Sequence, residues 1–234
     1  MVGSLGPGLN NRRSAAAHAR AAAAVAAAKG GSIVFNGSSS YLNLASDADL
    51  QFSTGNWTFE AFVYVSATSG VLFDYRPVAT SGAYPCMLFN ANKLTYIVNG
   101  TSAITGTVTM STNAWHHVAW SKSSGTLRQF VDGVQDGLSY SDSVNYASGF
   151  LTIGRNSNTG TSGYISGNIT NIRITKGQAL YVSNFGPPNA PMTAGANTKL
   201  LLLASTSGTA LADSSGLNKT VTNHSTTWSN SNPF

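Results

Sequence analysis

Short stretches in which apolar and polar residues alternate begin at residue 32 and recur along the rest of the chain. The stretch 57–65 reads WTFEAFVYV, with an apolar side chain at every second position from Trp57 to Val65, as on one face of a β-strand. Similar runs predict further strands at 32–36, 40–44, 70–74, 86–90, 94–98, 103–110, 115–121, 126–132, 150–154, 164–175 and 199–203. Turn residues separate the runs at short intervals, so the pattern predicts an all-β sandwich rather than βαβ units.

Two local signals refine this prediction. Asp132-Gly133 lies between two apolar runs, a combination typical of a type I′ hairpin turn. The continuous leucine run at 200–203 is too apolar for a solvent-exposed segment, and it predicts a strand buried on both faces.

The N-terminal segment 1–31 differs in composition from the rest. Its basic side chains are Arg12, Arg13, Arg20 and Lys29, and it has no acidic residue. The run SAAAHARAAAAVAAA predicts a helix at about 14–28, and Gly30-Gly31 can end it. The basic pair and the alanine run also fit a secretory or twin-arginine signal. Because His18 and Arg20 interrupt the run, we favour a basic arm that binds a partner protein or a neighbouring copy.

Charge is scarce and unevenly distributed. Only 9% of residues are charged, and most of the formal net charge of +5 lies in the arm, because nine basic and eight acidic residues remain in the body at 32–234. The body shows no basic face interleaved with aromatic residues, so we do not expect it to bind nucleic acid, although contact through the basic arm stays open. No apolar run approaches the roughly 20 residues of a membrane span.

The sequence offers little for catalysis. Glu60 is the only glutamate, and the aspartates are scattered, so no pair of carboxylates shares a strand face as glycoside hydrolysis would require. No GxSxG motif marks a nucleophile. We therefore predict that the protein is not an enzyme.

No metal site or disulfide is predicted. His116 and His117 are adjacent and point to opposite faces of a strand, so we expect one aromatic side chain in the core and one surface imidazole. Asp213 begins the sequence DSSG, which predicts an Asx turn, with a Ca²⁺ ligand as the weaker alternative. Cys86 has no second cysteine to pair with and fits a small buried side chain.

Carbohydrate binding is the more serious possibility. Aromatic rings stack on sugar rings, while amide and charged groups bond to their hydroxyls. Two polar and aromatic clusters provide such groups: Asp74, Tyr75, Arg76 and Tyr84 in one, and Arg155, Asn156, Asn158 and Tyr164 in the other. The alternative is that these are ordinary polar loops between strands.

A family resemblance rests on several blocks in one order. These blocks are FNGSSSYLNL, NWTFEAFVY, NAWHHVAWSKSSGTLRQFVDGVQDG, LTIG, GNITNIRITKGQALY and NFGPPNAP. Over about residues 32–194 the chain resembles the laminin-G-like, concanavalin A-like domains of tailed-phage and cyanophage structural proteins. The resemblance implies a jelly-roll β-sandwich over 32–234. The segment 199–234 looks like the strands that usually open such domains, so we expect it to supply the closing strands of its own sandwich or of a neighbour's.

The resemblance also implies a function. We expect a non-enzymatic structural protein on the outer surface of a phage particle, most simply a decoration or cement protein anchored by its N-terminal arm. Its partners would be the major capsid protein, other virion proteins and copies of itself. The alternative is a tail-fibre or appendage adhesin that binds a cell-surface glycan.

Overall fold

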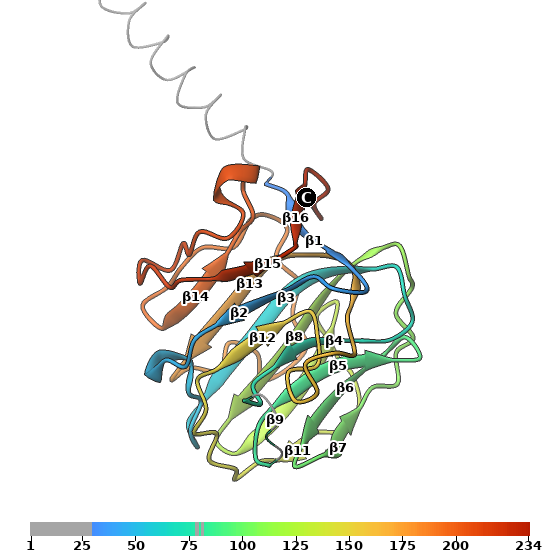
Figure 1. Cartoon of the computed structure of the whole chain (residues 1–234). Coiled ribbons are helices and arrows are strands. Elements are labelled where there is room, and N and C mark those ends of the chain that lie inside the picture. The colour runs from blue at the N-terminus through green and yellow to red at the C-terminus, as the bar shows by residue number, and fades with distance from the viewer. Residues whose placement is uncertain (1–29, 78–79, 81) are drawn as a thin grey trace, which may run out of the picture.

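The computed structural model describes residues 30–77, 80 and 82–234, and these form two antiparallel β-sheets that pack face to face (Figure 1). The predicted arm, its helix at about 14–28 and its basic residues Arg12, Arg13, Arg20 and Lys29 lie outside the described residues.

One sheet has nine strands and the other has seven. The nine-stranded sheet contains β1 (Ser32–Asn36), β3 (Trp57–Val65), β8 (Trp115–Ser123), β9 (Thr126–Val131), β10 (Val134–Gln135), β11 (Tyr140–Ser141), β13 (Ser166–Lys176), β14 (Thr198–Leu202) and β16 (Thr227–Ser229). The seven-stranded sheet has the order β15 (Thr222–His224), β2 (Tyr41–Leu44), β12 (Leu151–Ile153), β4 (Gly70–Asp74), β5 (Cys86–Asn90), β6 (Lys93–Val98) and β7 (Thr101–Thr105). Two short 3-10 helices, η1 (Ala48–Leu50) and η2 (Ser207–Thr209), lie between strands.

The predicted all-β sandwich is confirmed, and most strand boundaries agree within two residues. The run 103–110 is the main exception, because its strand, β7, ends at Thr105. The backbone amides of Thr107 and Val108 instead donate to the carboxylate of Asp136, which takes them out of the sheet ladder.

β3 shows how the core is built. Its alternate side chains from Trp57 to Val65 enter the core between the sheets, as predicted. The opposite side of β3 is also buried, because the segment 177–192 crosses the outer face of the nine-stranded sheet. Hydrogen bonds attach it there; among them, the Leu180 amide donates to Thr58 Oγ1 at 2.8 Å, and the Tyr181 hydroxyl donates to Glu60 at 2.7 Å.

The C-terminal segment pairs with strands of both sheets. β14 pairs with β13, β16 pairs with β1, and β15 pairs with β2. Figure 1 shows β15 and β16 in red beside the blue strands β2 and β1. Leu200, Leu201 and Leu202 are at most 1% exposed, which confirms the strand buried on both faces.

The predicted hairpin is also present. Asp132 and Gly133 both have positive φ angles, 49° and 77°, between the paired residues Val131 and Val134. A positive φ at both central residues is the requirement of a type I′ turn, and glycine meets it without steric cost.

Candidate functional site

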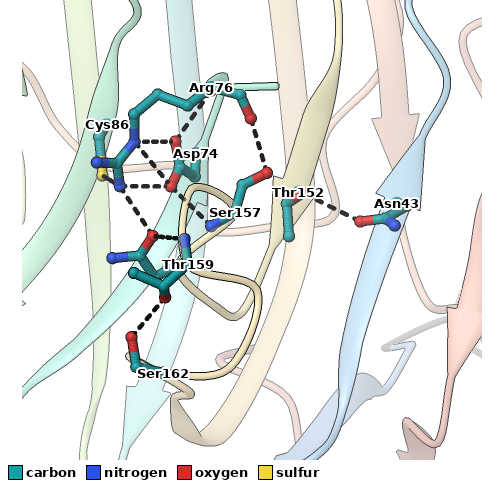
Figure 2. A network of polar contacts seen from close by, with 9 residues as sticks. Asn43, Asp74, Arg76, Cys86, Thr152, Ser157, Thr159 and Ser162 are labelled. Atoms are coloured by element: carbon teal, nitrogen blue, oxygen red, sulfur yellow. Dashed lines mark hydrogen bonds and ion pairs between the residues drawn. The ribbon is translucent and has the colours of Figure 1, made fainter. Parts of the chain in front are cut away.

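The outer face of the seven-stranded sheet brings the two predicted polar clusters together. Asp74 ends β4 and Arg76 follows two residues later, while Asn156 and Ser157 belong to the loop 154–164, which connects β12 to β13 and is called the rim loop below. The guanidinium of Arg76 donates to Asn156 Oδ1 at 3.2 Å, which joins the clusters directly. Figure 2 shows Asp74, Arg76 and Ser157 in this network.

Asp74 is the centre of this network. Its carboxylate is fully buried and accepts hydrogen bonds from Arg76 Nε at 2.9 Å and Nη2 at 2.6 Å, and from the Ser157 amide at 2.9 Å. These bonds to Asp74 raise the pKa of Arg76 above its usual value. The ion pair therefore neutralises the carboxylate and attaches the rim loop to the sheet.

The rim loop is fixed at further points. Ser157 Oγ donates to the carbonyl of Arg76 at 2.7 Å, and the amide of Val71 donates to the carbonyl of Gly163 at 2.9 Å. Gly163 has a φ of 65°, and a Cβ there would lie 3.0 Å from the Val71 side chain. Glycine thus allows the loop to lie close against β4.

Arg155 and Tyr164 stabilise the loop from its other side. Both donate to the carbonyl of Gly160, and the Arg155 guanidinium lies 3.5 Å above the centre of the Tyr41 ring. Tyr41 also stacks on His224 with a centroid distance of 4.0 Å. These contacts show Arg155 supporting the loop rather than extending freely into solvent.

A groove of about 370 Å³ adjoins the rim loop on the same sheet face. Its apolar part is formed by Val71, Leu88 and Ile97 from β4, β5 and β6. The lining also includes polar residues and a residue of the rim loop: Ser69, Asn90, Lys93, Thr95, Ser102, Thr105 and Gly163. A largely apolar concavity with a few polar groups is the usual form of a small-ligand site.

The other predicted sugar-binding residues are placed differently. Tyr75 is fully buried and packs against Phe52 with a centroid distance of 4.9 Å, so its side chain belongs to the core. Tyr84 is partly buried against the core cluster, and Asn158 is a partly exposed residue of the rim loop.

The sequence analysis missed the groove. Its lining comes from alternate positions of the β5–β6 hairpin, where Leu88 and Ile97 are apolar although they face away from the core. That alternation was visible in the sequence, but only the sheet order shows that β4, β5 and β6 present one continuous surface.

Glu60 belongs to a buried hydrogen-bond network beneath the segment 177–192. It accepts hydrogen bonds from His117 at 3.0 Å, Arg173 at 2.8 Å and Tyr181 at 2.7 Å. Burial alone would raise the pKa of its carboxyl, but these partners hold the pKa below its usual value. A fully buried, ionised carboxylate cannot serve as the general acid of a glycosidase.

Asp47 and Asp49 form the most exposed pair of neighbouring carboxylates described. Both accept hydrogen bonds from Lys219, at 2.6 and 2.7 Å, and these bonds lower the pKa of each carboxyl. Two ionised carboxylates leave no general acid, whose pKa must be raised toward neutrality.

The remaining candidate residues, His116, His117 and Asp213, form contacts within the fold. His117 is buried, but beneath the segment 177–192 with Glu60 rather than in the core between the sheets, so the expected core position is wrong. His116 is only partly buried and contacts Asp132. Asp213 accepts bonds from three backbone amides, those of Leu201, Ser215 and Lys219, including that of the predicted Asx turn.

Two searches of the described residues bear on metals and membranes. No cluster of three or more His, Cys, Asp or Glu side chains there could hold a metal ion. Within the same part of the chain, no helix has the length and apolar character needed to cross a bilayer.

Comparison with known families gives one match. A laminin G family model, described as the concanavalin A-like lectin/glucanases superfamily, matches residues 36–180, which is more than half of the chain. No curated protein sequence matches.

Solved structures share the fold at low identity. A protein from Bacteroides ovatus ATCC 8483, described as a "putative carbohydrate binding protein", superposes with a TM-score of 0.63 at 15% identity. The match covers 87% of this chain and 60% of that protein, so this chain spans less than two thirds of its length. The heptameric SAP-like pentraxin of Limulus polyphemus gives a TM-score of 0.51 at 16% identity, covering 70% of this chain and 89% of the pentraxin.

Proposed function

The chain belongs to the concanavalin A-like lectin/glucanase superfamily, and we propose that it is a non-enzymatic carbohydrate-binding domain. The observation that supports this most directly is the groove beside the rim loop. Its apolar part suits the C–H face of a sugar ring, and its hydroxyl and amide rim suits the ring's hydroxyls. The Bacteroides ovatus protein, which shares this fold, is itself described as carbohydrate-binding, and this description agrees with the proposal.

The Asp74–Arg76 ion pair supports the proposal through its position. It holds the rim loop against β4, so the groove is bordered by a loop with fixed backbone hydrogen bonds. A preformed site loses less entropy on binding than a loop that must first become ordered.

Binding should be tested first on an array of immobilised polysaccharides and then by calorimetry on the best oligosaccharide. Leu88→Ser and Ile97→Ser each remove part of the apolar surface from the groove. We expect each to weaken binding about tenfold, or 1.4 kcal/mol. Val134→Ser is the matched control, because Val134 is 53% exposed on β10 of the other sheet. An array without any bound polysaccharide, or full affinity in both groove variants, would overturn the proposal.

A second proposal concerns where the domain acts. We propose that it is displayed on a tailed-phage particle, as a head decoration protein anchored by residues 1–30 or as a tail adhesin. The support is the resemblance of the sequence blocks and the concentration of basic residues before residue 31. Quantitative mass spectrometry of purified particles separates the two, since decoration requires many copies and an adhesin few. Absence from particles would refute both roles.

A further inference from the structure

Lys93 differs from the other lysines in the described part of the chain. Lys122 pairs with Asp142, Lys199 and Lys219 pair with aspartates of the 47–49 turn, and Lys176 donates to a backbone carbonyl. Lys93 is the first residue of β6, and its side-chain ammonium makes no hydrogen bond or ion pair with any described residue. It lines the groove and is only partly exposed.

The residues that line the groove provide no counter-charge for Lys93. The groove lining contains no acidic residue, and Asp74 is the only acidic residue in the strands of this sheet. Its charge is already neutralised by Arg76. The unpaired ammonium of Lys93 therefore gives the groove a local positive charge.

The neighbouring polar groups suit an anion. Asn90 lies directly opposite Lys93 in the β5–β6 hairpin, and its Oδ1 already accepts a hydrogen bond from Ser69 at 3.1 Å. The side-chain Nδ2 of Asn90 has no hydrogen-bond partner among the described residues, so it is available to donate alongside Lys93.

We propose that the groove selects acidic saccharides, with the carboxylate or sulfate of the sugar bound by Lys93 and Asn90 while the ring lies on Leu88 and Ile97. This inference rests on the proposed carbohydrate binding and adds the class of ligand. Charge-assisted hydrogen bonds in a partly dehydrated groove are stronger than those of a neutral hydroxyl, so an anionic ligand is favoured over its neutral counterpart.

The test compares paired ligands by calorimetry with the full chain. The carboxylate pair is trigalacturonate and its methyl ester, and the sulfate pair is a sulfated galactan oligosaccharide and its desulfated form. The wild-type protein should bind the anionic member of at least one pair about tenfold more tightly. Lys93→Gln should remove that preference, and Lys93→Arg should retain it.

Three controls separate this inference from general electrostatics. Arg128→Gln removes one positive charge on β9, in the other sheet, and should keep the preference. Replacing all four basic residues of the arm by glutamine should keep it too. Thermal unfolding should show that Lys93→Gln remains folded, since this side chain has no described partner to lose.

The outcomes are distinguishable. Equal binding of both members of each pair, or a preference that survives in Lys93→Gln, would overturn the acidic-ligand inference and leave carbohydrate binding intact. Loss of the preference in the arm variant would assign it to the arm and also overturn the inference. Failure to bind any saccharide, charged or neutral, on the array as well as in solution would refute the proposed function itself.

Discussion

The ion pair beneath the rim loop makes a quantitative prediction for Asp74→Asn. The substitution keeps the size of the side chain but places an amide nitrogen where a carboxylate oxygen now accepts from Arg76 or from the Ser157 amide. Donor then faces donor, and the Arg76 guanidinium, whose side chain is only 17% exposed, loses its counter-ion. Removing one partner of a buried pair costs about 3–5 kcal/mol.

We expect the lower end of that range, about 3 kcal/mol, because Arg76 retains some contact with water. For a domain of this size that corresponds to a decrease of about 6–12 °C in melting temperature. Sugar affinity should fall as well, because the rim loop loses the Ser157 amide bond that attaches it to β4. Urea unfolding and calorimetry measure the two effects separately.

A double-mutant cycle tests the reasoning. Arg76→Met removes the charge that Asp74 neutralises, and the double variant Asp74→Asn, Arg76→Met leaves no unpaired guanidinium. The double variant should therefore be more stable than the sum of the single losses predicts, by about 1–3 kcal/mol. Additive losses, or an Asp74→Asn variant within 1 kcal/mol of wild type, would show that the pair does not hold the loop.

Three further predictions concern the rest of the chain. A fragment ending at residue 198 should be insoluble or molten, because burial of the leucines at 200–202 contributes roughly 5–9 kcal/mol of a net stability of about 5–15 kcal/mol; a cooperative melt close to wild type would contradict this. The hydrogen bond to Asp132 raises the pKa of His116 above its usual value of 6.5. The protonated His116–Asp132 pair should therefore contribute fully to the free energy of unfolding below about pH 6.5, and this contribution should be lost as the pH rises through the folded-state pKa. Urea titrations of His116→Gln should show a flatter pH dependence there, and an unchanged profile would argue against it. Neither wild type nor Glu60→Gln should release sugar from polysaccharides in a reducing-end assay, and turnover that disappears in Glu60→Gln would reverse the non-enzymatic assignment.

Much of the fold could be predicted from local pattern because alternation is a local property. The strand at 57–65 and the turn at Asp132-Gly133 depend on residues close in sequence, and both were predicted with the correct boundaries. The burial of Thr58 and Glu60 was not, because it depends on the segment 177–192, more than a hundred residues away. Thr58 and Glu60 on the outward side of β3 are therefore polar yet buried.

The site was predicted only in part for the same reason. The two clusters around Asp74 and Asn156 were identified separately, and the pairing of β12 with β4 brings them together. Tyr75 was grouped with Asp74 by sequence proximity, but successive side chains point in opposite directions along an extended chain, and the ring enters the core. Lys93 was overlooked because an isolated lysine has no pattern; its significance appears only when the partners of every other described lysine are known.

The arrangement of the covering segments also explains why one sheet face is available for a ligand. The segment 177–192 crosses the outer face of the nine-stranded sheet, and the hydrogen bond from Tyr181 to the buried Glu60 attaches it there. On the seven-stranded sheet the rim loop covers only the region around Asp74 and Asn156, and the groove over β4, β5 and β6 stays open. Buried ionic groups thus stabilise the covers on both faces. The side chain of Lys93 has no such described partner at the open groove, so replacing it tests the proposed ligand without removing a described contact of the fold.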